Sequence, residues 1–318
     1  MTYPDAPYHA DVASGPPQGR AHWVTAADGV RVRVAVWPEG TRGTVMIVPG
    51  RTEYTEKYSD AAAQLHARGF ASVAIDVRGQ GLSPRPAHDR LVGHVNDFKD
   101  FQIDVDAALA MCTDMDLPRP WYILGHSMGG LIALRTLVRC PTAFRRAAFS
   151  APMWGLPLPP HRRFMGWTIS SAAAAIGLGE RSARQSGNAA DPAAAPFEDN
   201  LLTRDARMFA WMKRQITTYP DLALGGPSLG WVWAALREMH ACARLAAPGV
   251  PALTFLGTDE DIVSADSIHV RMASWPNGEL QMVEGARHEV LMENAELRGQ
   301  IYDSIAAHFD GRFPTPAP

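Results

Sequence analysis

Cysteine is scarce in this chain of 318 residues. The three cysteines, Cys112, Cys140 and Cys242, lie far apart along the sequence. An odd number at such wide spacing supplies neither a disulfide framework nor the paired C-x-x-C pattern of a zinc site. Scattered thiols of this kind are typical of proteins in a reducing compartment. We therefore expect a cytoplasmic protein without structural disulfides.

Long apolar runs and an excess of positive charge are also missing. The first 20 residues contain neither the basic segment nor the apolar segment of a signal peptide. No window reaches the roughly 18 apolar residues that a membrane-spanning helix requires, and the best candidate, "SSAAAAIGLG" at 170–179, is too short. The formal net charge of -3 gives no basic surface for nucleic acid. The sequence thus predicts no membrane span and no nucleic-acid partner.

Short apolar, β-branched runs alternate with longer helix-like segments along most of the chain. Several runs are continuously apolar, as expected for strands that are buried on both faces of a sheet. Strands separated by helices of this length indicate βαβ units and a mostly parallel sheet, which is an α/β fold. The expected strands are 31–37, 44–50, 71–77, 121–127, 145–152, 251–257 and 279–285.

The alternation breaks once, between residues 153 and 245. Five of the nine tryptophans lie in this stretch (Trp154, Trp167, Trp211, Trp231 and Trp233). A helical insertion rich in large apolar side chains predicts a cap or lid over a site, because ligand sites favour domain interfaces and aromatic linings. An ordinary helical subdomain with its own tryptophan core is the alternative. We expect a core of residues 1–152 and 246–318 and a cap of residues 153–245.

The stretch "LGHSMGG" places Gly125, Ser127 and Gly129 at G-x-S-x-G spacing. A strand-like run precedes it and a helix-like run follows, which is the context of a strained turn that exposes a nucleophilic serine. The tetrahedral intermediate of acyl transfer needs two backbone N–H donors. We expect these from Met128, which follows the serine, and from Arg51, in the loop after the strand 44–50.

A nucleophilic serine requires a base, and His288 is the predicted one. In a sheet hydrolase the chain order is serine, acid, histidine. His269 lies inside a helix-like run and His308 on the final helix, so both are assigned to packing or to the surface. His288 follows a strand in "LQMVEGARHEV", in a loop at the sheet edge where the serine is also expected.

The acid that would orient the histidine lies in the loop after strand 251–257. This loop, "TDEDIVSAD", offers Asp259, Glu260, Asp261 and Asp266. Clustered acids can also form a solvated turn or the first turn of a helix, so the residues alone leave the choice open. The loop lacks the spacing of a calcium loop, and "HEVLM" lacks the second histidine of a zinc motif. No metal is expected.

A further carboxylate at a strand end is Asp76, in "IDVRGQGLSPRP". The G-x-G that follows it lacks the third glycine and the helix of a dinucleotide site. We interpret this segment as a structural loop near the pocket, and we expect no organic cofactor.

These motifs together resemble the α/β-hydrolase family of lysophospholipases and monoacylglycerol lipases, over residues 24–310. "VPGRTEYTEKYSDAAAQLHARGF" is similar to the family's H-G-x-x-E-H-x-x-R-Y block, and "AIDVRGQGLS" to its D-x-x-G-x-G-x-S block. "LGHSMGG" matches the nucleophile turn, and "GARHEVLMENAELR" resembles the histidine segment of the bacterial lysophospholipases. The resemblance implies a mostly parallel central sheet flanked by helices, with a helical cap inserted after the sixth strand.

Two positions decide how far the resemblance carries. The family's usual histidine before the oxyanion glycine is Pro49 here, so any hydrogen bond from that histidine is missing. The family's acid stands three residues after the strand-end glycine, and this position, counted from Gly257, is Glu260. Aspartate is the commoner residue there, while the bacterial branch resembles this chain in having glutamate. The resemblance therefore implies Glu260, with Asp261 and Asp259 behind it.

The resemblance implies two-step hydrolysis of a single-chain lipid ester, a lysophospholipid or a monoacylglycerol. The lipid tail would lie beneath the cap, and the cap would touch the membrane surface transiently. No obligate protein partner is evident. Two alternatives stay open: a small-ester carboxylesterase or peptidase of the same fold, and a catalytically silent binding protein. A serine nucleophile argues against dehalogenase or epoxide hydrolase chemistry, which uses a carboxylate.

Overall fold

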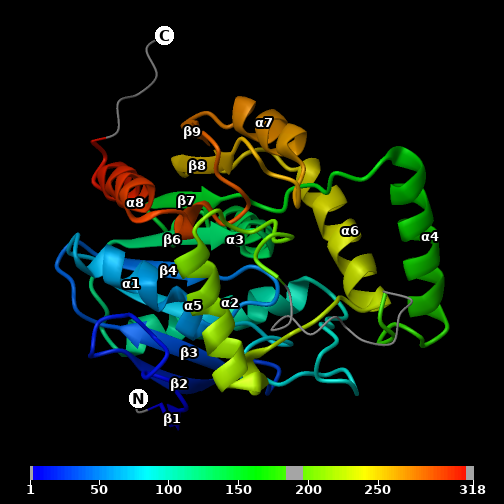
Figure 1. Cartoon of the computed structure of the whole chain (residues 1–318), viewed down its shortest axis with the longest axis horizontal. Helices are drawn as coiled ribbons and strands as arrows, with labels where there is room; N and C mark the ends of the chain where they lie inside the picture. The colour runs from blue at the N-terminus through cyan, green and yellow to red at the C-terminus, as the bar shows by residue number, and fades with distance from the viewer. Residues whose placement is uncertain (1–2, 184–195, 313–318) are drawn as a thin grey trace.

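The computed structural model describes residues 3–183 and 196–312, and its centre is a nine-stranded sheet (Figure 1). The strands are β1 (Asp5–Ala6), β2 (Arg20–Thr25), β3 (Arg31–Trp37), β4 (Thr44–Val48), β5 (Ala71–Asp76), β6 (Trp121–His126), β7 (Arg146–Ser150), β8 (Ala252–Gly257) and β9 (Gly278–Val283). Their order in the sheet is β1-β2-β3-β5-β4-β6-β7-β8-β9.

Most neighbouring strands of this sheet are parallel. The strands from β5 to β9 pair in parallel, while β1, β2 and β3 add an antiparallel edge. Every residue of β4, β5, β6 and β8 is buried, as their continuously apolar sequences predicted. The α/β fold class is confirmed, and all seven expected strands are present.

Helices cover both faces of the sheet (Figure 1). The bounds of the helices of this layer are α1 (Ser59–His66), α2 (Lys99–Asp114), α3 (Met128–Arg139), α7 (Ala265–Ala273) and α8 (Ala295–Phe309). Alternate residues of β4 enter opposite cores, because successive strand side chains point to opposite faces. Met46 packs in the cluster that contains residues of α2, α3 and α7, whereas Ile47 packs in the cluster of α1 and α8.

In the described part of the insertion between β7 and β8, three longer helices lie at the place of the expected cap. They are α4 (Pro160–Ala175), α5 (Ala206–Thr218) and α6 (Leu229–Ala243), with the short 3-10 helix η3 (Pro220–Leu222) between the last two. Residues 184–195 of the expected cap lie outside the described residues. The helices follow the seventh strand in chain order and not the sixth, which the resemblance implied. Two strands, β1 and β2, precede the first strand expected from the sequence.

The insertion is split in space. The helices α4 and α6 pack side by side, where Trp167 meets the edge of Trp233 with ring centroids 4.7 Å apart (Figure 1). The helix α5 instead contacts the 3-10 helix η1 (Thr55–Tyr58), where Gln215 of α5 accepts a hydrogen bond from Tyr54 at 3.1 Å. The tryptophans of the insertion do not form a single core of their own. Trp231 instead packs against Phe98 of the main core, with ring centroids 5.9 Å apart.

The described helices include none that combines the length and the apolar character needed to cross a bilayer.

Candidate active site

The serine of the G-x-S-x-G motif lies in a strained turn between β6 and α3. Ser127 has φ 50° and ψ −119°, a backbone conformation that residues other than glycine rarely adopt. A Cβ atom at Gly129 would lie 1.9 Å from the carbonyl oxygen of Val48, so only glycine lets the turn approach the end of β4 this closely. The Ser127 carbonyl accepts hydrogen bonds from the N–H groups of Gly130 and Met153 at 2.9 and 2.8 Å. The turn is therefore held rigidly, with the serine 8% exposed.

His288 and Glu260 meet at the same edge of the sheet. His288 lies between β9 and the 3-10 helix η4 (Val290–Met292), and Glu260 follows β8. The Nδ1 of His288 is 2.7 Å from a carboxylate oxygen of Glu260. Because a carboxylate only accepts, Nδ1 carries the proton and the Nε2 lone pair is left to act as a base.

The second oxygen of Glu260 is also engaged. It accepts hydrogen bonds from the N–H groups of Ile262 at 2.6 Å and Val263 at 2.9 Å. Burial by itself raises the pKa of this carboxyl, but the hydrogen bonds and charge of His288 and the two backbone amides lower the pKa below its usual range. Glu260 is therefore ionised at neutral pH and fixed in orientation.

The other acids of the loop lie elsewhere. Asp259 forms an ion pair with Arg204 and its side chain is 40% exposed. Asp261 and Asp266 are exposed. Of these four acids, all in the described part of the chain, the structure brings Glu260 to hydrogen-bonding distance of His288.

The two histidines assigned to packing or surface are also away from this edge. His269 is exposed on α7. His308 is buried on α8, and its Nε2 lies 3.0 Å from the Ala147 carbonyl oxygen. Because a carbonyl only accepts, Nε2 donates this hydrogen bond. Burial lowers the pKa of His308 to about 4, so this histidine is neutral at physiological pH.

The loop after β4 carries the second expected oxyanion donor. Met128 is the first residue of α3. Gly129, which follows it, packs directly against the carbonyl oxygens of Val48 and Pro49. The N–H of Gly50 donates to Glu53, so it is already used. Arg51 is the next residue, and its guanidinium donates to the Gly225 carbonyl at 2.6 Å. The structure thus brings the Met128 turn and the Arg51 loop together.

The Gly50 segment is held without the histidine that Pro49 replaces. Gln80 donates to the Gly50 carbonyl at 2.9 Å and accepts from the Thr52 N–H at 2.9 Å. Thr52 itself has φ 70°, a second strained position in this loop. A buried glutamine and a buried glutamate therefore take over the fixing of the loop.

A cluster of buried charged side chains lies beneath these loops, and the sequence did not predict it. It consists of Glu53, Lys57, His126 and Glu289, each at most 5% exposed. One oxygen of Glu289 lies 2.5 Å from the Lys57 ammonium and 3.3 Å from His126 Nε2. Glu53 also pairs with Lys57, and accepts from the Tyr58 hydroxyl at 2.5 Å. The only sequence signal was the position of Glu289 beside His288 and of Glu53 and Lys57 four residues apart in one motif.

Three members of this cluster also have the geometry of a metal site. Ligand atoms of Glu53, His126 and Glu289 lie within 4.8 Å of one another. The Lys57 ammonium, however, pairs with both carboxylates. The ammonium group already supplies the positive charge between the two carboxylates. These residues therefore do not fit an additional metal ion.

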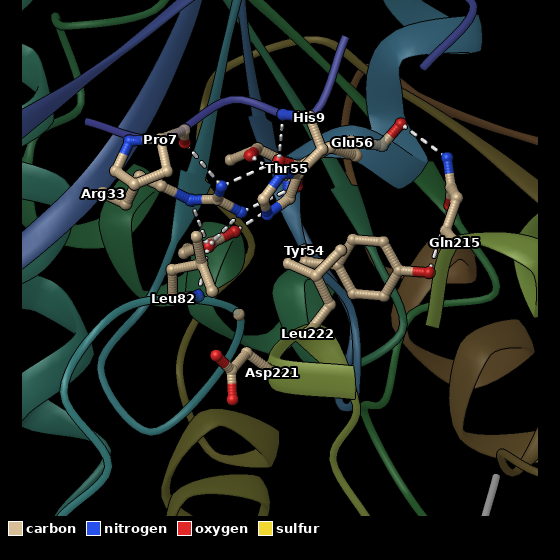
Figure 2. A network of polar contacts seen from close by, with 12 residues as sticks. Pro7, His9, Arg33, Tyr54, Thr55, Glu56, Leu82, Gln215, Asp221 and Leu222 are labelled. Carbon is tan, nitrogen blue, oxygen red and sulfur yellow. Dashed lines mark hydrogen bonds and ion pairs between the residues drawn. The ribbon is translucent and has the colours of Figure 1, made fainter. Parts of the chain in front are cut away.

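A second buried network is centred on Arg33, which Figure 2 labels together with Glu56 and Thr55. Asp76 belongs to this network through its ion pair with Arg33. The Arg33 guanidinium forms two hydrogen bonds with Glu56, at 2.8 and 2.7 Å, and a third with Asp76 at 2.7 Å. Asp76 also accepts from the N–H groups of Thr55 and Leu82, each at 2.8 Å. Asp76 thus joins the start of η1 to β5.

An apolar cavity lies between α4, α6 and the start of α7. Its volume is about 590 Å³, within the range of small-molecule sites. Its lining is mainly apolar, from Trp154, Leu156, Leu158, Phe164, Trp167, Leu236 and Met239, with Arg163, His240 and Ser267 as polar members. Trp154 links it to the serine turn, because its indole N–H donates to the Gly130 carbonyl at 3.2 Å.

Comparison with known proteins places the chain among hydrolases. Residues 39–295 match the Hydrolase_4 family model, described as serine aminopeptidase, S33. The chain is 31% identical over 285 residues to lysophospholipase L2 of Escherichia coli strain K12, covering 84% of this chain and 80% of that protein. It is 30% identical over 133 residues to monoacylglycerol lipase of Mycolicibacterium smegmatis, covering 41% of this chain and 46% of that protein.

The fold is also found in solved structures. A soluble variant of monoglyceride lipase from Saccharomyces cerevisiae, in complex with a substrate analog, superposes with a TM-score of 0.70. The two chains are 19% identical, and the match covers 99% of this chain and 100% of the other.

Proposed function

Because this chain belongs to the serine aminopeptidase S33 family of α/β-hydrolases, we propose that it works through a triad of Ser127, His288 and Glu260. The chain is a serine ester hydrolase that acts on lipids. The observation that carries the triad is the 2.7 Å hydrogen bond from His288 to Glu260 at the sheet edge that also carries the strained serine turn.

In the proposed mechanism, Nε2 of His288 removes the proton of the Ser127 hydroxyl, and the oxygen attacks the ester carbonyl. The N–H groups of Met128 and Arg51 stabilise the oxyanion of the tetrahedral intermediate. His288 then gives the proton to the leaving alcohol, and a water molecule, activated by the same histidine, releases the acid. Glu260 stays ionised throughout and balances the transient imidazolium.

For the substrate we propose a single-chain lipid, a lysophospholipid or a monoacylglycerol. The family relatives are named for these two activities. The apolar cavity under α4 and α6 would hold the acyl chain, and residues 153–245 would act as the cap that covers it. Arg163, His240 and Ser267 are the polar groups of this cavity, and Arg163 is the one that carries a positive charge for a headgroup.

The outer surface of α4 supports transient contact with a membrane. Met165 and Ile169 of α4 and Ile176, directly after its end, are 53, 52 and 70% exposed. Two arginines, 162 and 163, precede this apolar group and are exposed. Exposed apolar side chains beside basic ones are typical of helices that lie in a membrane interface. The three free thiols support a cytoplasmic location for the same enzyme.

One panel of assays tests these proposals. The purified protein and its Ser127→Ala variant are incubated with p-nitrophenyl esters of short and long chains, lysophosphatidylcholine, monoacylglycerol and an aminoacyl p-nitroanilide. We expect hydrolysis of the two lipids and loss of nearly all activity in the variant. Hydrolysis of the anilide alone would favour the peptidase, and of short esters alone the small-ester carboxylesterase. No turnover and no labelling by a fluorophosphonate would favour a binding protein.

A further inference from the structure

The buried cluster of Glu53, Lys57, His126 and Glu289 touches all three loops of the proposed active site. Glu53 accepts from the Gly50 N–H, in the loop of the oxyanion donor Arg51. His126 directly precedes Ser127 in the nucleophile turn, and Glu289 directly follows His288. The cluster therefore connects these three loops through buried charged side chains.

The hydrogen-bond geometry of His126 fixes both ring nitrogens. Its Nδ1 lies 3.0 Å from the Ser150 carbonyl oxygen, which only accepts, so Nδ1 carries a proton. Its Nε2 faces two carboxylates, with Glu289 at 3.3 Å and Glu53 at 3.6 Å. A bare nitrogen lone pair at this place would point at two negative groups, whereas an N–H would donate to them.

The charge count leads to the same result. The cluster contains two carboxylates and one ammonium, each almost completely buried. An unbalanced charge in a protein interior is strongly unfavourable, and a second cation makes the cluster neutral. No other cation is needed if His126 is charged.

We propose that His126 is an imidazolium at neutral pH that closes a neutral quartet with Glu53, Lys57 and Glu289, and that this quartet positions the oxyanion loop, the nucleophile turn and the histidine loop relative to one another. The inference rests on the proposed function for its catalytic consequence, but not for the protonation state itself. His126 acts as a positioning residue, through Ser127 and Gly50, without contact to the reacting atoms.

The surroundings of His126 support this charge state. Burial lowers the pKa of His126, but Glu289 and Glu53 raise it by more, and Lys57 opposes them only in part. Burial raises the pKa of Glu289, but His126, Lys57 and a side-chain hydrogen bond with Glu53 together hold it well below its usual range. The remaining ionisable neighbours are Tyr58, which donates to Glu53, and His288, whose ring centroid is 4.9 Å away.

The protonation state is measured by nitrogen NMR of the protein with labelled histidines, between about pH 7 and 8. We expect both nitrogens of His126 to show the protonated type of signal. His308 serves as the internal control, because this buried histidine has a lowered pKa, of about 4, and should show one protonated and one bare nitrogen. The His126 signals are assigned by His126→Gln and, independently, by Ser150→Ala, which removes one contact to Nδ1 but keeps the ring. A bare nitrogen in His126 would overturn the proposal.

The positioning role is measured by a double-mutant cycle. His126→Gln leaves the quartet with one excess negative charge, so kcat should fall about 10²-fold while KM changes little. Adding Glu289→Gln to this variant restores neutrality. The kcat of the double variant should therefore be about tenfold higher than that of His126→Gln. If the double variant shows only the product of the two single losses, the quartet does not act as a unit and the proposal is wrong.

The two proposals fail separately. If the wild-type protein hydrolyses no ester, the proposed function is lost. The NMR signals then still decide the charge of His126, and the same cycle is read out as the denaturant midpoint of unfolding. Recovery of this midpoint in the double variant would support the neutral quartet, and additivity would refute it.

Discussion

The choice of Glu260 over its neighbours as the triad acid leads to a quantitative prediction for Glu260→Gln. The glutamine carbonyl can keep the hydrogen bonds from the N–H groups of Ile262 and Val263, so the loop should retain its fold. Its amide nitrogen then faces Nδ1 of His288, which must accept instead of donate. The histidine is held in the tautomer whose Nε2 carries a proton, and it cannot deprotonate Ser127.

The size of the effect follows from this geometry. The wrong tautomer in a serine triad lowers kcat by about 10⁴, which corresponds to about 5.4 kcal/mol at 1.36 kcal/mol for each factor of ten. The lost hydrogen bond from His288 to a charged partner accounts for only about 1.5–3 kcal/mol of this. The larger part comes from the misplaced proton, so the loss should appear in kcat while KM stays nearly constant.

The assay compares Glu260→Gln with two matched variants of the same loop. Asp259→Asn removes an ion pair whose aspartate side chain is 40% exposed, and Asp261→Asn changes an exposed residue. Both should retain kcat within about 2-fold, since exposed pairs contribute little. Steady-state hydrolysis of a p-nitrophenyl ester and the rate of fluorophosphonate labelling are measured for all three. If Glu260→Gln keeps activity within tenfold and one of the aspartate variants loses about 10³-fold, the assignment is wrong.

Three more outcomes are expected. Gly129→Ala places a Cβ atom 1.9 Å from the Val48 carbonyl oxygen and should lower the free energy of unfolding by about 3 kcal/mol. Gly299→Ala in α8, with no atom within 4 Å of its Cβ, should raise the free energy of unfolding by about 0.5–1 kcal/mol. Equal denaturant midpoints for the two variants would contradict the packing argument. The folded-state pKa of His126 is raised above 6.5, so its ion pairs stabilise the fold fully below pH 6.5 and lose this effect as pH rises through the folded value. Above pH 6.5, the stability difference between wild type and His126→Gln should therefore shrink with rising pH, and a difference that grows would contradict the raised pKa. Ile169→Ser with Ile176→Ser should reduce co-sedimentation with anionic vesicles, while Val270→Ser on α7, at a residue that is 73% exposed, should not; loss of binding in both would remove α4 as the contact.

The sequence predicted the sheet because its strands carry an unusual pattern. A strand such as β5 reads as a continuous apolar run only when both faces are covered, and that pattern also implies parallel neighbours. The strands β1 and β2 were missed for the opposite reason. In β2, Arg20–Thr25, only Ala21 and Val24 are buried, and the strand mixes charged with aromatic side chains near the edge of the sheet. The split of the insertion into α4–α6 and α5 depends on contacts far along the chain, and no local pattern encodes it.

The proposed triad could be assembled from the sequence because parallel strands bring their carboxyl ends to one edge. Ser127, Glu260 and His288 each follow a strand, so topology alone predicts their proximity. The choice among adjacent acids could not come from topology. Asp259, Glu260 and Asp261 differ by one position each, and the turn after β8 decides which side chain points inward.

The buried charges could not be predicted, because charged residues in a sequence normally indicate a solvated surface. Pro49 shows why they matter. A proline at this position supplies no side-chain donor, yet the Gly50 N–H is held by Glu53 and the Gly50 carbonyl by Gln80. The orientation of the proposed oxyanion loop thus depends on Glu53, whose charge in turn is balanced by Lys57 and His126. Replacing Pro49 by histidine should therefore change activity less than neutralising Glu53, since the loop is already fixed from beneath.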